Sequence, residues 1–177
     1  MAMVITKAAR SSGNADFKQP AAERGVWLDR IPFRYPRFPA SFPGPGGATH
    51  PLAALWGLGD YAHKLQHDGI PFPWQPQQRT GQTLINLEQA IKDSPTLIYG
   101  VGETGIPHVV VPIEHSENGW KILDPGTPTE KNPVTWSDER LQKWWRNYSI
   151  LYPAGTMISL IPAGAASAED ARKIRTK

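Results

Sequence analysis

Apolar side chains recur at helical spacing in two stretches of the first hundred residues, and a threonine stands near the start of each stretch. The first stretch runs from about His50 to His67, with Thr49 in position to cap it. The second runs from about Gln82 to Asp93, with Thr83 as its cap. Apolar residues three and four positions apart share one face of a helix. The pattern therefore predicts two amphipathic helices.

The first predicted helix contains two glycines, Gly57 and Gly59. Each glycine costs roughly 1 kcal/mol relative to alanine inside a helix. Glycines kept at that cost indicate that another element approaches the helix closely at this point.

Short apolar runs follow the second helix and predict strands at 96–101, 108–114 and 120–123. The connections at 102–107 and 116–119 are short and contain glycine. Tight turns of this length favour antiparallel pairing between consecutive strands. We therefore expect an antiparallel meander.

A third helix is predicted to begin at Ser137, because Trp136 and Leu141 occupy the two positions of a hydrophobic staple. Two closing strands are predicted at 149–152 and 157–161. The order of helices and strands is that of an α+β fold, in which helices pack on one twisted antiparallel sheet.

Proline interrupts this pattern at 26–51 and again at 70–79, where a loop is expected. Proline fixes its own backbone and lacks a donor, so regular helix is excluded in the first of these segments, which we expect to lie extended over the domain. Residues 1–25 are polar and small and predict a flexible N-terminal arm, and 163–177 predict a solvated C-terminal tail. The folded domain is therefore expected at 26–162.

Length and composition narrow the class of protein. The chain has 177 residues, which favours a single domain, and a net charge of +3. The basic residues do not alternate with aromatic ones in a patch, so nucleic-acid binding is not expected. No apolar run approaches the ~20 residues of a membrane span, and the first ten residues have no signal-peptide core. We expect a soluble protein, and its compartment is left open.

The chain contains no cysteine. Disulfides, thiolate metal sites and a thiol nucleophile are all excluded in this chain for that reason. His63 and His67 lie one helical turn apart, but no acidic or thiol partner stands at suitable spacing. We expect neither a metal site nor another cofactor.

His108 and Asp124 are the strongest candidates for chemistry. His108 opens a predicted strand and Asp124 follows the end of the next one. In an antiparallel hairpin these two ends lie side by side, so the side chains are expected to meet. A carboxylate there would hold the imidazole in one tautomer, as a catalytic base requires. A nucleophile would belong at a helix N-terminus, and the helix that begins near Thr49 is the candidate.

The stretch from Gly81 to Ile161 resembles the bacteriocin-processing, or double-glycine, peptidase family of the papain-like group. The resemblance covers about half of the chain. It implies a papain-like fold, a bacterial origin, and a cysteine peptidase that acts on a peptide or protein. The motifs that carry it are Leu84-Ile85-Asn86-Leu87, Ser94-Pro95-Thr96-Leu97-Ile98, Pro107-His108-Val109-Val110-Val111, Leu123-Asp124-Pro125-Gly126, and the helix at Trp136-Ser137 with Trp144.

This chain departs from that family at the nucleophile. The family's cysteine opens a helix, and the nearest match here begins at Ala48, with Thr49 beside it. By this resemblance Ala48 is the nucleophile position, substituted in this chain. The family also places a glutamine before the cysteine, and 35–43 contains none. Transglutaminase-like domains share the same order of catalytic residues and are the nearest rival within the broad fold.

Each candidate residue also has a purely structural interpretation. His108 is then a strand-end histidine bonded to a neighbour, and Asp124 is an ordinary turn former before Pro125. Thr49 is most simply a helix cap, and its hydroxyl is a poor nucleophile unless strongly activated. Glu103 is then a turn residue. The tryptophans at 136, 144 and 145 would belong to the core.

Three functional hypotheses follow. The first is a cysteine peptidase, active if position 48 is natively cysteine and inactive in the chain as given. The second is a naturally inactive relative that keeps its cleft to bind a peptide or protein partner. The third is an interaction protein whose sheet and helices serve assembly alone. The first two need a cleft beside His108, and the third needs none.

Overall fold

The computed structural model describes residues 55, 58–59, 62–63, 65–69, 72–102, 105, 107–147 and 153–163. Ala48, Thr49 and Glu103 lie outside these residues. So do the predicted arm, the proline-rich segment 26–51, the predicted strand 149–152 and most of the predicted tail. Those expectations therefore stay predictions.

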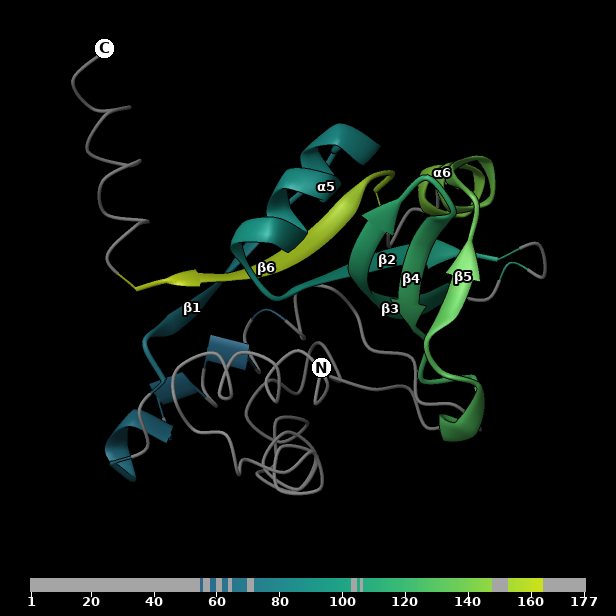
Figure 1. Ribbon diagram of the computed structural model, residues 1–177. Helices are drawn as coiled ribbons and strands as arrows, with labels where there is room; N and C mark the ends of the chain where they lie inside the picture. Colours follow the sequence, from purple (N-terminus) through teal and green to yellow (C-terminus); the bar gives the residue numbers. More distant parts are fainter. Residues whose placement is uncertain are drawn as a thin grey trace, which may run out of the picture.

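Six strands form one antiparallel sheet in the order β1-β6-β2-β3-β4-β5, and the sheet twists along its length (Figure 1). The three strands of the predicted meander are present and are neighbours, and helices cover the sheet. The α+β expectation is confirmed. The strands are β1 (Trp74–Arg79), β2 (Thr96–Val101), β3 (Pro107–Ser116), β4 (Gly119–Leu123), β5 (Val134–Trp136) and β6 (Thr156–Pro162).

Two helices begin where capping residues predict them. In α5 (Leu84–Asp93) the Thr83 side chain accepts a hydrogen bond from the Asn86 backbone N–H, and the Asn86 side chain accepts one from the Thr83 N–H. In α6 (Asp138–Arg146) the Ser137 side chain accepts from the Arg140 N–H. Each bond satisfies a donor that a helix start otherwise leaves without a partner. A short 3-10 helix, η1 (Thr129–Lys131), precedes β5.

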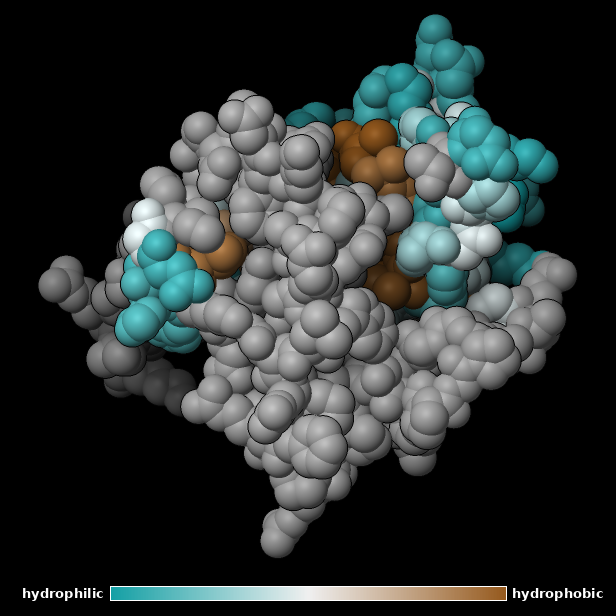
Figure 2. Space-filling view, turned by 90° about the horizontal axis from the view of Figure 1, so that it is seen from below, coloured by the Kyte–Doolittle hydropathy of each residue, from teal (hydrophilic) through white to brown (hydrophobic). Residues whose placement is uncertain are grey.

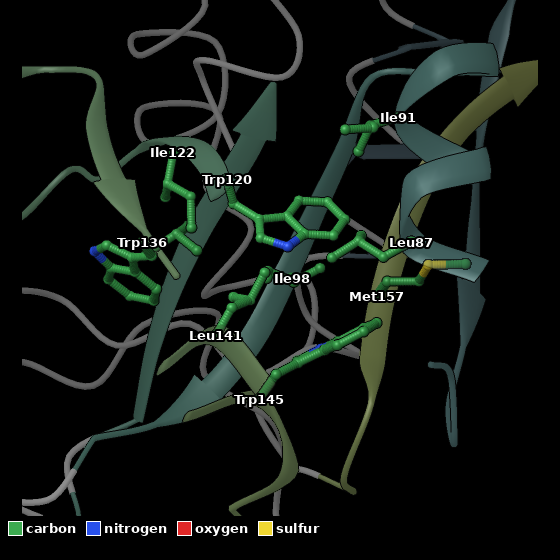
Figure 3. Close-up of a cluster of buried hydrophobic side chains, with 10 residues drawn as sticks. Leu87, Ile91, Ile98, Trp120, Ile122, Trp136, Leu141, Trp145 and Met157 are labelled. Carbon is green, nitrogen blue, oxygen red and sulfur yellow. The ribbon is translucent and has the colours of Figure 1, made fainter. Parts of the chain in front are cut away.

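Both helices pack on the same face of the sheet and share one apolar cluster (Figures 1 and 3). Ile98 pairs directly with Val110 on one side and Met157 on the other, so these three side chains share that face. The buried members of the cluster are Leu87, Ile91, Ile98, Val110, Trp120, Ile122, Trp136, Leu141, Trp145 and Met157.

The opposite face of the sheet is buried as well. Leu97 and Ile158 pair across β2 and β6, and both are fully buried, as is Leu160, while Tyr99 is nearly so. Of the first predicted helix, 55, 58–59, 62–63 and 65–67 are helical where described. Its apolar positions Leu58, Ala62 and Leu65 are buried, as the amphipathic pattern predicts.

The expected loop at 70–79 is wrong over most of its length, because 74–79 form β1. This strand pairs with β6 from Trp74 to Arg79 and lies at the edge of the sheet. Proline is tolerated on edge strands, where its missing donor costs no ladder bond. Pro76 therefore did not mark a loop. The three-residue strand β5 was not predicted either.

On the face drawn in Figure 2, more of the described surface is polar than apolar. Figure 2 shows small brown areas of apolar residues and broader teal areas of polar ones among the described atoms. Among those residues, Ile85 is the exposed large apolar side chain, at 80% exposure. None of the described helices has the length and apolar character needed to cross a membrane.

Candidate functional site

His108 is the second residue of β3 and lies opposite Gly100 of β2. Alternate residues of a strand share a face. Because Val110 belongs to the cluster beneath α5 and α6, His108 lies on that same face, beyond the end of the apolar core. Its side chain is 35% exposed.

Asp124 follows the last residue of β4, and its carboxylate meets the imidazole as predicted. The Nε2 nitrogen of His108 lies 2.6 Å from Oδ1 of Asp124. The carboxylate is only 15% exposed, and the Gly126 backbone N–H donates to the same oxygen at 2.8 Å. Since Nε2–H donates to the carboxylate, Nδ1 is the ring nitrogen left to act on another group. No described residue bonds to Nδ1.

A third residue, Asn132, fixes the position of Asp124 and was missed from the sequence. Its Oδ1 accepts from the Asp124 N–H at 3.0 Å, and its Nδ2 donates to the Asp124 carbonyl at 2.9 Å. The same Nδ2 donates to the Thr127 carbonyl at 2.9 Å. One amide side chain therefore holds the whole turn after β4. The sequence feature that could have indicated Asn132 is the presence of a polar residue a few positions after the Asp-Pro-Gly sequence.

Gly126 covers the histidine–aspartate pair closely. A Cβ at this position would lie 3.2 Å from Oδ1 of Asp124 and 3.5 Å from Cε1 of His108. These two neighbours are joined to each other by the hydrogen bond at 2.6 Å. The Asp-Pro-Gly turn thus shields one side of the pair.

An open cavity of about 770 Å³ lies beside His108, between the end of β2 and helix α6. A cavity of this size is within the range of small-ligand and peptide-residue sites. The described residues that line it are Val101, Gly102, His108, Trp136, Ser137, Glu139, Arg140, Lys143, Trp144 and Asn147.

Two tryptophans form the aromatic wall of this cavity. Trp136 and Trp144 meet edge to face, with ring centroids 5.3 Å apart. Trp144 lies against Gly100, where a Cβ would come within 2.5 Å of its ring. Trp136 and Trp145 are buried in the core, as expected, whereas half-buried Trp144 is shared between core and cavity.

His115 is held differently and shows that a histidine–carboxylate contact is not by itself a site. Its Nε2 lies 3.0 Å from Asp138 and its Nδ1 lies 3.3 Å from Glu88. The ring stacks on Trp120, whose indole N–H donates to Asp138 at 2.8 Å. Both ring nitrogens are engaged, so His115 joins α5 to the start of α6.

The remaining histidine candidates do not gather with other ligands. His67 lies 3.4 Å from the neighbouring Asp68, and both side chains are exposed. Within the described part of the chain, no three His, Cys, Asp or Glu side chains come together as a metal ion would require.

Comparison with known proteins gives a limited likeness. No protein-family model matches the sequence, and no curated protein matches it. Among solved structures, a crystal structure described as that of a "putative C39-like peptidase" from Bacillus anthracis is similar, with a TM-score of 0.41 and 19% identity. The match covers 60% of this chain and 58% of that one, so this chain spans little more than half of its length. A likeness of this degree carries no argument about activity.

Proposed function

We propose that the chain is a papain-like domain of the cysteine-peptidase type, in which His108 and Asp124 are the base half of the site. The observation that carries the proposal is the 2.6 Å contact between Nε2 of His108 and Oδ1 of Asp124, at the edge of the cavity. This contact leaves Nδ1 to take a proton from a nucleophile. The chain itself supplies no thiol, since it contains no cysteine.

The nucleophile position is proposed at Ala48, with Thr49 as the cap of the following helix. A thiol there would stand at the positive end of a helix and beside an imidazole. Both features lower a thiol pKa from about 8.5. The absence of any other cysteine makes Ala48→Cys a single-thiol protein, in which every reaction with an alkylating reagent reports on position 48.

The test is the pH dependence of alkylation of Ala48→Cys by iodoacetamide. We expect the reaction at about pH 6 to be at least tenfold faster than that of an exposed control thiol, Glu117→Cys. Adding His108→Ala should remove the difference. Adding His115→Ala, which alters a histidine engaged at both nitrogens, should leave it unchanged.

A thiol at position 48 that reacts like the control, with or without His108, would overturn the assignment of the nucleophile position. Repeating the measurement with Thr49→Cys separates an error of one residue from a failure of the whole site. If neither thiol responds to His108, the helix near Thr49 does not face the imidazole.

A second candidate function is peptide binding without cleavage. The observation that motivates it is the cavity of about 770 Å³ beside His108, which could hold a peptide whether or not cleavage follows. The two candidates share the cavity and differ in turnover. Peptides that bind but are not cleaved by the Ala48→Cys protein would support this candidate over the first.

A further inference from the structure

The wall that α6 contributes to the cavity carries a positively charged side chain on a rigid platform. Cζ of Arg140 lies 4.5 Å from the centroid of the Trp136 ring. That ring is 5% exposed and is fixed by β5 and the core. Stacking on an aromatic face holds a guanidinium in place and leaves the N–H donors at its edge available.

No described residue neutralises this charge. Arg140 makes no ion pair with the described carboxylates, and its neighbour Glu139 makes none either. Lys143, one helical turn from Glu139, lines the same wall. Among the described lining, Arg140 is therefore a guanidinium that no described carboxylate pairs with. The nearby Asn147 amide already donates to the Val101 carbonyl at 2.8 Å.

We propose that Arg140 selects a carboxylate in the bound peptide, so that the cavity takes an acidic peptide segment. This inference rests on the peptide-site function proposed above. A planar guanidinium can bind a carboxylate through two parallel N–H···O bonds, which a lysine cannot reproduce. Because Trp136 already orders the arginine, little side-chain freedom is lost on binding. The half-buried ring of Trp144 offers an apolar contact for the adjoining peptide residue.

The test uses the full chain labelled with 15N and a set of hexapeptides blocked at both ends. The peptides are identical except for one position, which holds Glu, Gln or Lys. A fourth peptide keeps Gln and has a free C-terminal carboxylate, which distinguishes a chain end from an acidic side chain. The indole N–H signals of Trp136 and Trp144 report binding in the cavity. Those of Trp120 and Trp145 serve as internal controls, since they donate to Asp138 and to the Thr156 carbonyl.

We expect the Glu peptide to bind about fivefold or more tightly than the Gln peptide, with the difference shrinking as salt is raised. Arg140→Gln should abolish the difference, and Arg140→Glu should reverse it in favour of the Lys peptide. Arg146→Gln changes an exposed arginine of the same helix outside the described lining and should preserve the difference. Stronger binding of the peptide with the free C-terminus would assign the carboxylate to a chain end.

Two outcomes would count against the inference, and they are distinct. Peptides that shift the indole N–H signals of Trp136 and Trp144 without regard to peptide charge would overturn the role of Arg140 and leave the peptide site standing. Peptides of every charge that leave both signals unmoved would overturn the peptide site, and the role of Arg140 with it.

Discussion

His108 and His115 lie in the same strand, and each contacts a carboxylate, yet their rings are held differently. His115 has Glu88 at one nitrogen and Asp138 at the other. His108 has Asp124 at Nε2 and no described partner at Nδ1. A ring engaged on both sides is a structural link. A ring engaged on one side is oriented and still able to accept a proton, which is the condition for a general base.

The orientation of His108 predicts its tautomer. When the ring is neutral, the proton should reside on Nε2, because that nitrogen faces the Asp124 carboxylate. Long-range 1H–15N correlation spectra distinguish the two nitrogens directly. Asp124→Asn should produce a mixture of tautomers, since the amide group can donate as well as accept. A neutral ring that carries its proton on Nδ1 in the unaltered protein would contradict the proposed role of His108 as a base.

Asn132 predicts a second effect on the same pair. Asn132→Asp keeps an acceptor for the Asp124 N–H but removes the two donors to the Asp124 and Thr127 carbonyls. Loss of such bonds typically costs about 1–3 kcal/mol when partly buried groups lose their partners. We expect a lower free energy of unfolding in urea and a less uniform His108 tautomer. Asn118→Asp, in the exposed turn before β4, is the control. An unchanged tautomer would limit Asn132 to a stabilising role.

The starts of helices α5 and α6 were predicted to within two residues, because their start signals are local. Thr83 and Ser137 cap from the position next to the helix, and the apolar spacing follows in the same window. The strand β1 was not predicted, because its place depends on β6, more than seventy residues away in the chain. Judged from its neighbours in the sequence alone, Pro76 predicts a loop. Proline is nevertheless accepted in a strand at the edge of a sheet, and that edge position depends on the pairing with β6.

Replacement of glycine by alanine is predicted to change stability in opposite directions at two positions, Gly100 of β2 and Gly59 of the first helix. At Gly100 of β2 the new Cβ would lie 2.5 to 2.7 Å from three atoms of the Trp144 ring, so Gly100→Ala should destabilise by about 1–3 kcal/mol and displace that ring. At Gly59 the nearest atom is Cγ of Pro76 at 3.8 Å, an ordinary contact. The close approach expected there is not close enough to require glycine. Gly59→Ala should therefore stabilise the helix by up to about 1 kcal/mol.

Urea unfolding of both variants, with the Trp144 indole signal as the local probe, measures these effects. The important result is the sign of each change. Destabilisation by Gly59→Ala would mean that the helix cannot accept a methyl group against β1. A neutral Gly100→Ala would mean that Trp144 moves without cost and does not form a fixed wall of the cavity.

The contact between Glu88 of α5 and His115 of β3 predicts that the free energy of unfolding depends on pH. A hydrogen bond from Lys92, followed by one from His115, lowers the pKa of Glu88 below its usual value. A lowered pKa in the folded state stabilises the fold above the unfolded-state pKa, and that contribution is lost as pH falls through the folded-state value. The difference in unfolding free energy between the protein and Glu88→Gln should thus be present at neutral pH and close as pH falls through the lowered pKa of Glu88.

Because Glu88 is at the surface, this difference should be small and should weaken with salt. Urea unfolding across the acid range measures it, and Glu117→Gln, in the exposed turn between β3 and β4, is the control. A difference that grows toward acid pH would show that the ionised Glu88 opposes folding.

The pair His108 and Asp124 could be predicted from the sequence, but the cavity beside this pair could not. His108 and Asp124 are sixteen residues apart, and hairpin geometry alone brings them together. The cavity requires α6 to cross the end of β2, which places Trp144 on Gly100 and Arg140 in the same cavity lining as His108. No local pattern encodes such a crossing, because it depends on how the helix packs on a sheet made of distant strands.

The chain as a unit predicts an absence of thiol-dependent turnover. A thiolate is the attacking species in a cysteine peptidase, and this sequence has no cysteine. An oriented imidazole can still activate water, but removal of the nucleophile from such a site leaves only a small residual rate. We expect no cleavage of a peptide mixture above that of His108→Ala, as measured by mass spectrometry over hours. Cleavage that disappears in His108→Ala and resists alkylating reagents would mean that His108 and Asp124 act through water or a hydroxyl group. The thiol requirement would then be wrong, and Thr49 would become the first hydroxyl to replace, by Thr49→Ala.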